Sequence, residues 1–551
     1  MKNLSLLTGV LCLTAILPAQ AAESEQQATD KVIVLPETKI SEKMKLRPEE
    51  KWLTGTIGNF EIFSHASERE TRTFISEFYK FHQAFIYLFP KSDVKLANKL
   101  KLVLCGSTDK FTALAPANYN NLSTMVSDGN DCYLLIDLAV KSRFTGNSRA
   151  YVITGDTWIP GGDGLFGPSP YDFIDGSVLA RREYIHFLSE RANPRPPLWF
   201  EEGIAMYFSS MEITKNKITY ARLGKDVVTW LDGPSMLPME KFFALPKESG
   251  GYNPNFSRQA LVFVHYTMFA RKMLYQKSLL AFADKASLEP VTEEMFRRYF
   301  GMSLNDMEGA LLSYIKDGGF FKYVVAPKKI KFPIEPAYEL RATTDVENGL
   351  LKGNILRLVK RYEDANAELM SPILRKHSDI RLVAALGVLE YNMGNFSAAR
   401  KHLEDAVAAK VDDCTAYITL ARLRLHEALK AAVPAGALNA DQMSDVLTPL
   451  FAARALDQPL PDIYSLIADI WEYSHITPSQ DNLAILDDGV QKFPRNSDLV
   501  YKDAVLKGRY KFYNDAHALI DLGLRHARDQ KTQDRFTKLR ADLPQATESV
   551  Q

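Results

Sequence analysis

The hydrophobic pattern divides the chain into two parts of different character. In residues 51–323, short apolar runs typical of buried strands alternate with longer stretches in which apolar residues recur at helical spacing. The first helix predicted in this way covers residues 68–89 and ends before Pro90, since proline cannot continue a helix. The predicted strands are residues 58–65, 99–105 and 132–140. This alternation predicts an α+β domain.

Later in the same part, the pattern predicts a helical hairpin. Residues 181–188 and 198–210 both have helical spacing, and the proline-rich sequence at 193–197 ends the first helix. Residues 256–274 predict a third helix. Residues 155–170 are rich in Gly and Pro and predict a loop, whose glycines lack the spacing of a phosphate-binding loop.

Residues 346–545 are almost entirely helical in pattern and repeat themselves. Small and aromatic residues recur 34 positions apart: Gly353, Tyr362 and Ala365 return as Gly387, Phe396 and Ala399, and the same phase returns at Ala504, Tyr513 and Ala516. A period of this length is typical of tetratricopeptide repeats, whose helix pairs stack on their neighbours. The sequence therefore predicts an all-α tetratricopeptide-repeat solenoid, degenerate around residues 425–480. The proline-containing segment 324–345 is the predicted linker to it.

The N-terminus has the pattern of a secretory signal peptide. A charged start precedes an apolar run from Leu4 to Leu17, and small residues follow it, which predicts a signal peptide over residues 1–21. Residues 22–50 are polar, lack periodic apolar positions and predict a flexible leader. The expected location is therefore outside the cytoplasm, in the periplasm or beyond the cell.

Composition narrows the kinds of partner that the protein can have. The chain has 67 basic and 67 acidic side chains and a formal net charge of zero, so no basic field favours nucleic acid. No segment after the signal is apolar enough to insert in a membrane. Cys105 and Cys132 lie at strand-like segments, and the sequence leaves open whether they form a disulfide or remain buried thiols.

The predicted hairpin contains the candidate catalytic and metal-binding residues. Residues i and i+4 share one face of a helix, so Arg182 and His186 point the same way, with Glu183 beside them. In the zinc-binding pattern HExxH, two histidines at these positions bind the metal, and the Glu activates the metal-bound water. Glu202, on the following helix, can lie beside His186 as a further ligand.

The residues around this hairpin give it a family resemblance. The stretch from Arg182 to Phe208 resembles the gluzincin metallopeptidases of the peptidase MA type, in which a Pro and a Trp follow HExxH and lead into Glu-Gly-x-Ala-x-Tyr-Phe. The matching positions here are Trp199, Glu202, Gly203, Ala205, Tyr207 and Phe208. The beginning of the domain also looks like a group of secreted bacterial domains that are often fused to tetratricopeptide repeats. The resemblance implies a gluzincin-like domain over residues 51–323.

By the resemblance, Glu183 matches the general base, and His186 and Glu202 match metal ligands. The departure is Arg182, which stands at the first ligand position. A guanidinium has no lone pair to offer a metal and stays protonated, so only two of the three usual protein ligands remain. The favoured interpretation is a non-catalytic domain that needs no cofactor, in which Arg182 faces Glu202, with Glu183 as a second carboxylate that it can pair with.

Two other interpretations stay open. An active zinc metallopeptidase would need another ligand, and His265 or Asp175 are the available substitutes. In the third interpretation the repeats are the functional part, because such arrays form surfaces that bind proteins or peptides. This last role is compatible with a non-catalytic first domain, so the expected partner is a protein or peptide.

Overall fold

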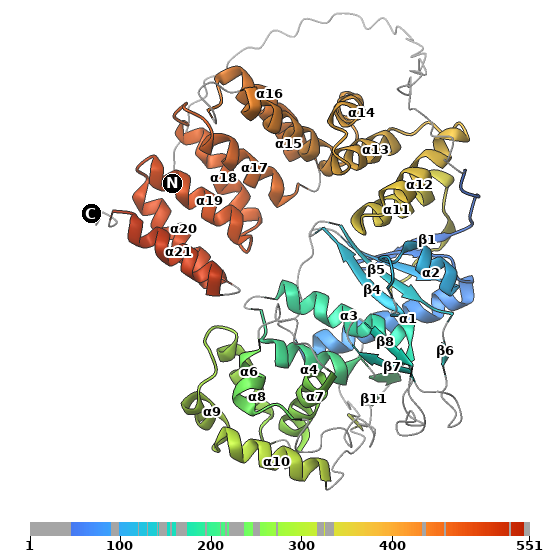
Figure 1. The fold of residues 1–551 in the computed structure, drawn as a ribbon, viewed down its shortest axis with the longest axis vertical. Helices are drawn as coiled ribbons and strands as arrows, with labels where there is room; N and C mark the ends of the chain where they lie inside the picture. Colours follow the sequence, from blue (N-terminus) through green and yellow to red (C-terminus); the bar gives the residue numbers. More distant parts are fainter. Residues whose placement is uncertain are drawn as a thin grey trace, which may run out of the picture.

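A computed structural model describes residues 46–89, 99–119, 121–128, 131–139, 141–142, 151–154, 157–160, 174–192, 195–209, 211–214, 217–219, 236–245, 254–270, 274–316, 324–325, 336–431, 437–456, 459–527 and 530–544 (Figure 1).

The N-terminal part is built on a mixed β-sheet. Within the described residues this sheet has six strands in the order β13–β1–β2–β3–β5–β4. Strands β2, β3 and β5 run parallel, and each outer strand is antiparallel to its neighbour. The predicted strands are confirmed as β2, β3 and β5. The strand bounds are β1 Leu53–Ile57, β2 Phe60–Ser64, β3 Leu100–Cys105, β4 Ser123–Ser127, β5 Cys132–Asp137 and β13 Arg341–Ala342.

Helix α1 (Glu68–Leu88) connects two of the parallel strands, β2 and β3. It begins at a capping box, in which the Ser67 side chain accepts from the backbone N–H of Glu70 and the Glu70 side chain accepts from that of Ser67. Its buried face includes Phe74, Phe78 and Phe81. The helix predicted over 68–89 is therefore confirmed, because its apolar spacing matches the face that covers the sheet.

Both faces of the sheet are buried, since successive residues of a strand point to opposite sides. On one face, Leu102 and Leu134 pack in a core with α1 and α3 (Gly176–Arg191). On the other face, Val103 and Leu135 pack with α2 (Thr108–Leu114) and the first helices of the C-terminal part. Burial on both sides explains why apolar residues predominate on both faces of the central strands.

The remaining elements of this part surround the α3 helix and its partner. The further helices are α4 Leu198–Phe208, α6 Met239–Ala244, α7 Pro254–Phe269, α8 Gln276–Ala286, α9 Glu293–Phe300 and α10 Leu304–Lys316. The short strands are β6 Lys141–Ser142, β7 Tyr151–Thr154, β8 Thr157–Pro160, β9 Ile174–Asp175, β10 Glu212–Thr214, β11 Lys217–Thr219 and β12 Val324–Val325. The three predicted helices correspond to α3, α4 and α7.

One prediction in this region is wrong in part. Residues 155–170 were expected to form a loop, but Thr157–Pro160 is the strand β8, which pairs with β7 in antiparallel fashion. Pairing with a preceding strand supplies backbone hydrogen bonds that composition alone does not reveal. The rest of the segment lies outside the described residues.

The two cysteines of the sheet are free thiols. Cys105 ends β3 and Cys132 begins β5, and the parallel register pairs Cys105 with Asp137 instead. Five residues of strand separate the two positions, which corresponds to roughly 16 Å and exceeds the reach of a disulfide. Of the two alternatives that the sequence left open, the buried thiols are therefore correct.

The C-terminal part is an array of helical hairpins (Figure 1). Helices that follow one another pack as pairs from α11 to α20, and α21 packs on the last pair. The helix bounds are α11 Asp345–Leu358, α12 Tyr362–Leu374, α13 Ile380–Asn392, α14 Phe396–Ala408, α15 Cys414–Ala431, α16 Ala440–Arg454, α17 Pro461–Glu472, α18 Gln480–Lys492, α19 Ser497–Arg509, α20 Tyr513–His526 and α21 Gln530–Asp542.

The 34-residue period has a packing cause. A Cβ added to Gly353 would lie 2.5 Å from the Leu369 side chain, and one added to Gly387 would lie 2.7 Å from Leu403, which is 34 residues further on. In these two hairpins a glycine stands where the paired helices cross in close contact. The predicted helical repeat is therefore confirmed as an architecture. No helix in the described part of the chain combines the length and apolar character needed to cross a bilayer.

The segments expected to be a leader and a linker take part in the fold at their inner ends. Within the leader, Arg47 pairs with Asp364 of α12 at 2.6 Å, and Glu50 pairs with Lys110 at 2.6 Å. Within the linker, β12 and β13 pair with β11 and β1. The leader is therefore shorter than residues 22–50 suggest, and its residues 22–45 lie outside the described residues, as does the predicted signal peptide.

Candidate functional site

The candidate site lies on the hairpin of α3 and α4. Helix α4 packs closely on α7, because a Cβ added to Gly203 would lie 2.6 Å from the Ala260 carbonyl oxygen. The indole of Trp199 is buried and contacts the rings of Phe243 and Phe263 edge to face. These contacts hold one face of α4 against α7, so that the side chains on the opposite face are held against α3.

Arg182 and Glu202 form an ion pair across the hairpin. The Nη2 of Arg182 donates to Oε1 of Glu202, whose side chain is fully buried, whereas 24 % of the Arg182 side chain is exposed. A buried carboxylate needs a cation or several hydrogen bonds to remain ionised. The guanidinium supplies that charge, as the sequence interpretation expected.

His186 lies between two carboxylates. Its Nδ1–H donates to Oε1 of Glu201 at 2.9 Å, and its Nε2 is 3.3 Å from Oε2 of Glu202. Burial alone would lower the pKa of His186, but the hydrogen bond to Glu201 and the charges of both glutamates outweigh it and raise the pKa. The surroundings thus favour the imidazolium form, in which both ring nitrogens carry protons.

Glu183 faces the same cluster from α3. Burial raises the pKa of Glu183 above its ordinary value, and the charges of His186 and Arg182 oppose that rise. A carboxyl group with a raised pKa is suited to proton transfer, but buried groups of structural clusters show the same shift. The shift alone therefore assigns Glu183 no catalytic role.

Glu201 is a member of the cluster that the sequence interpretation missed. Its side chain is 1 % exposed, and besides His186 it contacts Arg195, whose Nη2 is 3.5 Å from Oε2. The pattern Glu-Glu-Gly at 201–203 offers two candidate carboxylates, and the family pattern drew attention only to Glu202. Arg195, in the proline-rich turn just before α4, was the signal in the sequence that could have revealed the role of Glu201. A second buried glutamate beside Glu202 needs a cation nearby.

The chemistry of this donor set does not suit a catalytic zinc ion. Such a site takes three protein ligands whose lone pairs face the metal. Here the third position belongs to Arg182, whose guanidinium offers no lone pair and pairs with Glu202, so only His186 and Glu202 remain as ligands. The residues present form a compensated charge cluster, and no reaction step through zinc follows from them.

Of the two substitutes for the missing ligand, the structure describes the side chain of His265 alone. His265 is buried on α7, where its Nδ1 is 2.8 Å from the hydroxyl of Tyr314 and its ring contacts Tyr207 and Phe269. Burial lowers the pKa of His265 to about 3, as expected for a histidine in an aromatic core. The backbone of Asp175 belongs to β9, and its side chain lies outside what the structure describes.

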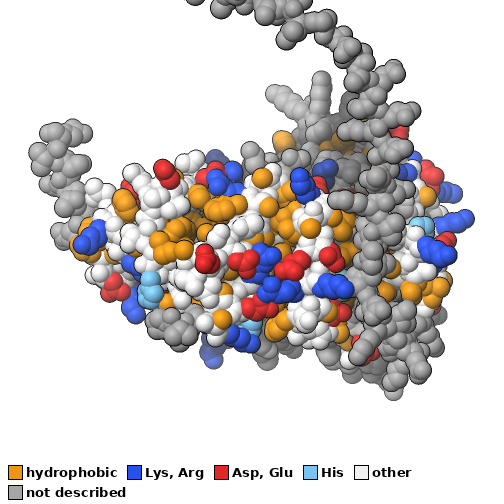
Figure 2. All heavy atoms as spheres, turned by 90° about the horizontal axis from the view of Figure 1, so that it is seen from above, with side chains coloured by type: hydrophobic (Ala, Val, Ile, Leu, Met, Phe, Trp, Pro, Cys, Tyr) orange, Lys and Arg blue, Asp and Glu red, His pale blue; other side chains and the backbone are white. Residues whose placement is uncertain are grey.

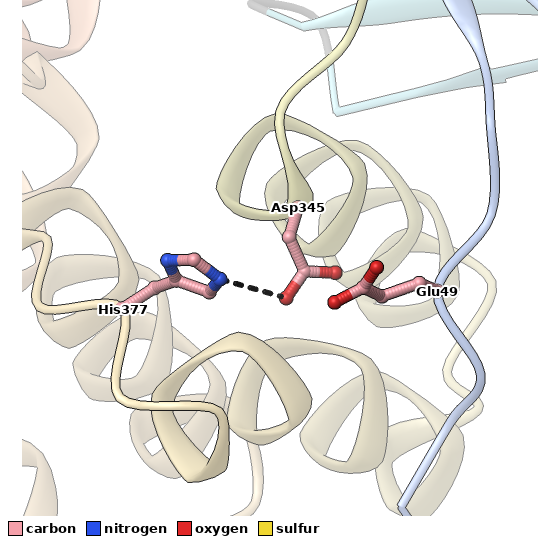
Figure 3. A group of neighbouring side chains, drawn as sticks. All are labelled: Glu49, Asp345 and His377. Carbon is pink, nitrogen blue, oxygen red and sulfur yellow. Dashed lines mark ion pairs between the residues drawn. The ribbon is translucent and has the colours of Figure 1, made fainter.

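A separate trio of possible metal ligands lies where the leader meets the array. Within the described part of the chain, Glu49, Asp345 and His377 present ligand atoms within 4.8 Å of one another (Figure 3). Arg375 already supplies a cation there, since its Nη1 is 2.7 Å from both oxygens of Asp345 and its Nε is 3.8 Å from Glu49. We therefore interpret this trio as part of an ion-pair network that anchors the leader.

Comparison with known proteins gives limited likenesses. No protein-family description matches the chain, and no curated protein matches it. Among solved structures, a thermophilic tetratricopeptide-repeat protein of Thermus thermophilus shares 14 % identity with a TM-score of 0.27, covering 36 % of this chain and 100 % of that one. The P58(IPK) tetratricopeptide-repeat domain shares 12 % identity with a TM-score of 0.19, covering 66 % of this chain and 93 % of that one. At these scores the assignment of a helical repeat rests on the hairpins themselves.

Proposed function

We propose that this protein is an exported, non-catalytic relative of the gluzincin metallopeptidases that binds a protein or peptide partner through its helical array. The observation that carries the proposal is the pairing of Arg182 with the buried Glu202. The charge that a metal would bring to this carboxylate is supplied by a side chain, so the hairpin is stable without an ion.

Three features support the parts of the proposal. The sequence around Trp199 and Glu202 and the close α4–α7 packing favour the family relationship. The N-terminal apolar run over Leu4–Leu17 favours export. The stacked hairpins favour partner binding, because helical arrays present extended surfaces built from neighbouring repeats.

Metal content tests the non-catalytic part. The purified protein is incubated with excess ZnCl₂, dialysed, and its bound zinc is measured by atomic absorption beside the variant R182H, which restores HExxH. We expect far less than one zinc per chain in the parent protein and no hydrolysis of casein. Near-stoichiometric zinc that survives dialysis of the parent protein would overturn the proposal. A folded R182H that binds no zinc would show that the hairpin does not derive from a metal site.

Peptide selection tests the binding part. A phage library of random twelve-residue peptides is selected on the immobilised full chain, and selected peptides are synthesised and measured by fluorescence anisotropy. We expect saturable binding that is retained when Arg182 is replaced by Leu, because the hairpin and the array are separate surfaces. If the affinity for peptide changed in the Arg182 variant but not in variants of the array, the assignment of binding to the repeats would be wrong.

A further inference from the structure

The repeat pattern fails around residues 425–480, and the structure has an irregular hairpin there. The turns after α11 and α13 span residues 359–361 and 393–395, whereas the turn after α17 runs from Tyr473 to Ser479. This longer turn pairs back on the segment before α16, since the N–H of Leu438 donates to the Tyr473 carbonyl oxygen at 2.9 Å. The irregularity is therefore built into the fold.

A groove of about 310 Å³ lies at this irregular hairpin, between α16, the end of α17 and the beginning of α18. Its volume is at the lower end of the range for ligand sites. The lining residues carry no formal charge: Ala440, Met443, Ser444, Leu447, Thr448, Phe451, Trp471, Ile476 and Asn482.

Large apolar side chains reach solvent at the groove. Phe451 is 41 % exposed and Ile476 is 40 % exposed, and Tyr473, at the start of the turn that contains Ile476, is 43 % exposed. Figure 2 shows hydrophobic side chains reaching the surface of the molecule in several places between charged ones. Exposed apolar side chains that cluster around a hollow are typical of an interaction site.

The tryptophan in the wall of the groove has an unused donor. Trp471 is 7 % exposed, and among the described residues its Nε1–H has no hydrogen-bond acceptor. A buried indole N–H normally has one, because leaving it unpaired costs free energy. A polypeptide bound in the groove would bring backbone carbonyl oxygens close to this indole.

Acidic residues at the rim of the groove indicate which kind of polypeptide it would bind. Asp441 and Asp481 stand in the first turns of α16 and α18, next in sequence to the lining residues Ala440 and Asn482. On the helix, Asp441 is about 90° from the centre of the lining strip and about 20° beyond the lining residue Thr448, which places it beside the groove. Neither carboxylate has a cationic partner within the described part of the chain, unlike Asp445, which pairs with Arg424 at 2.7 Å.

We propose that this groove, lined by α16, Trp471, Ile476 and Asn482, binds a partner segment that presents a Leu- or Phe-sized side chain next to a lysine or arginine. The inference rests on the proposed function and names the place and the chemistry of partner binding. The apolar side chain enters between Phe451 and Ile476, and the flanking cation meets Asp441 or Asp481. Complementary charge sets the register of such a segment, and the apolar anchor provides most of the affinity.

Defined peptides test the proposal on the full chain. The probe is a fluorescein-labelled ten-residue peptide with a central Phe-Leu pair between two lysines on a Gly/Ser background, and sister peptides carry Glu for Lys or Ala for Phe-Leu. We expect the first peptide to bind at least about tenfold more tightly than either sister, as for an interface anchor. Equal binding of all three peptides would overturn the assigned chemistry.

Groove variants then locate the binding. Phe451→Ala and Thr448→Trp, which remove the anchor contact and fill the hollow, should each weaken binding at least about tenfold. Asp441→Lys together with Asp481→Lys should reverse the preference between the Lys and Glu peptides, which a merely unfolded array would not do. The control Asp515→Lys reverses a first-turn carboxylate of α20 and should leave affinity unchanged.

The outcomes separate this inference from the proposed function. If selected phage peptides bind but ignore Phe451→Ala and Thr448→Trp, the array binds peptides elsewhere and the groove assignment falls alone. If no peptide binds the chain, both proposals fall. Light scattering that shows a dimer dissolved by Thr448→Trp would overturn the choice of occupant in favour of a second copy. Peptide binding that occurs only after deletion of residues 22–45 would overturn it in favour of the leader.

Discussion

The guanidinium of Arg182 pairs with a carboxylate, that of Glu202, whose side chain is fully buried. The two residues come from different helices of one hairpin, 20 positions apart in the chain. The pair therefore links the two helices of the hairpin and also neutralises the buried carboxylate of Glu202. Its effect on stability can be measured.

Removing Arg182 alone should destabilise the protein more than removing both Arg182 and Glu202. In Arg182→Leu the buried Glu202 loses its principal cation, and we expect a loss of unfolding free energy on the order of 3 kcal/mol. The double variant Arg182→Leu/Glu202→Leu should recover most of that loss, since an apolar pair needs no desolvated charge. Urea denaturation monitored by circular dichroism gives both values.

An exposed pair provides the matched control. Arg341 is 61 % exposed and pairs with Glu347, so Arg341→Leu should cost less than about 1 kcal/mol. A double variant at the hairpin that is as unstable as Arg182→Leu alone would show that the pair does more than compensate charge.

The position of His186 between two carboxylates predicts a dependence on pH. Because the pKa of His186 is raised in the folded protein, its stabilising contribution is complete below the ordinary value of 6.5 and is lost as pH rises through the folded value. The difference in melting temperature between the parent protein and His186→Gln should therefore shrink as pH rises above the ordinary value of 6.5. Differential scanning fluorimetry at a series of pH values measures it.

Glu201 should be responsible for much of this dependence. The hydrogen bond from His186 to Glu201 is the largest influence raising the pKa of the imidazole against its burial. In a Glu201→Gln background the pH dependence of His186→Gln should weaken. A difference that stays constant with pH in both backgrounds would place the imidazole outside this charge cluster.

The sequence could predict features whose cause is local or periodic. The spacing of Phe74, Phe78 and Phe81 reveals the buried face of α1, and the glycines at 353 and 387 mark helix crossings that recur with the repeat. The contact between Glu202 and His186 followed from two helices joined by a short turn. In each case neighbouring residues determine the geometry.

Features that depend on distant chain segments could not be predicted. The edge strand Arg341–Ala342 is two residues long and becomes a strand only because β1 offers hydrogen bonds across nearly 300 positions of sequence. The second apolar face of the sheet, with Val103 and Leu135, gave no sign that repeat helices cover it. Glu201 was missed because the family pattern directed attention to Glu202, and its contact with His186 crosses from one helix of the hairpin to the other.

Close packing of α4 on α7 makes Gly203 sensitive to the smallest change. A Cβ there would meet the Val264 side chain and the Ala260 carbonyl oxygen, and the latter belongs to a helix backbone that cannot rotate away. We expect Gly203→Ala to destabilise the protein by about 1–3 kcal/mol. Urea denaturation compares it with Gly309→Ala.

The control glycine should show the opposite sign. Gly309 lies in α10 and nothing lies within 4 Å of an added Cβ, so Gly309→Ala should stabilise by about 0.5–1 kcal/mol through helix propensity. If both variants changed stability equally, the close approach of α4 and α7 would be incorrect.

A buried carboxyl in the array predicts an unusual gain of stability. Asp503 on α19 is fully buried, and among the described residues neither carboxylate oxygen has a hydrogen-bond partner. Burial raises the pKa of Asp503 to about 7, against the opposing charge of Lys507. Asp503 therefore ionises more readily in the unfolded chain than in the folded protein, which lowers the stability of the fold. This loss of stability is absent below pH 3.8, the ordinary pKa of an aspartate, and grows as the pH rises to the folded-state pKa.

Replacing Asp503 by Asn removes the charge at every pH. We expect Asp503→Asn to stabilise the protein on the order of 3 kcal/mol more at pH 8 than at pH 4, measured by urea denaturation at both values. Asp498→Asn is the control, since Asp498 is 50 % exposed on the same helix and its ion pair with Lys502 contributes little in water. An equal gain at both pH values would mean that side-chain packing, and not ionisation, limits stability at this position.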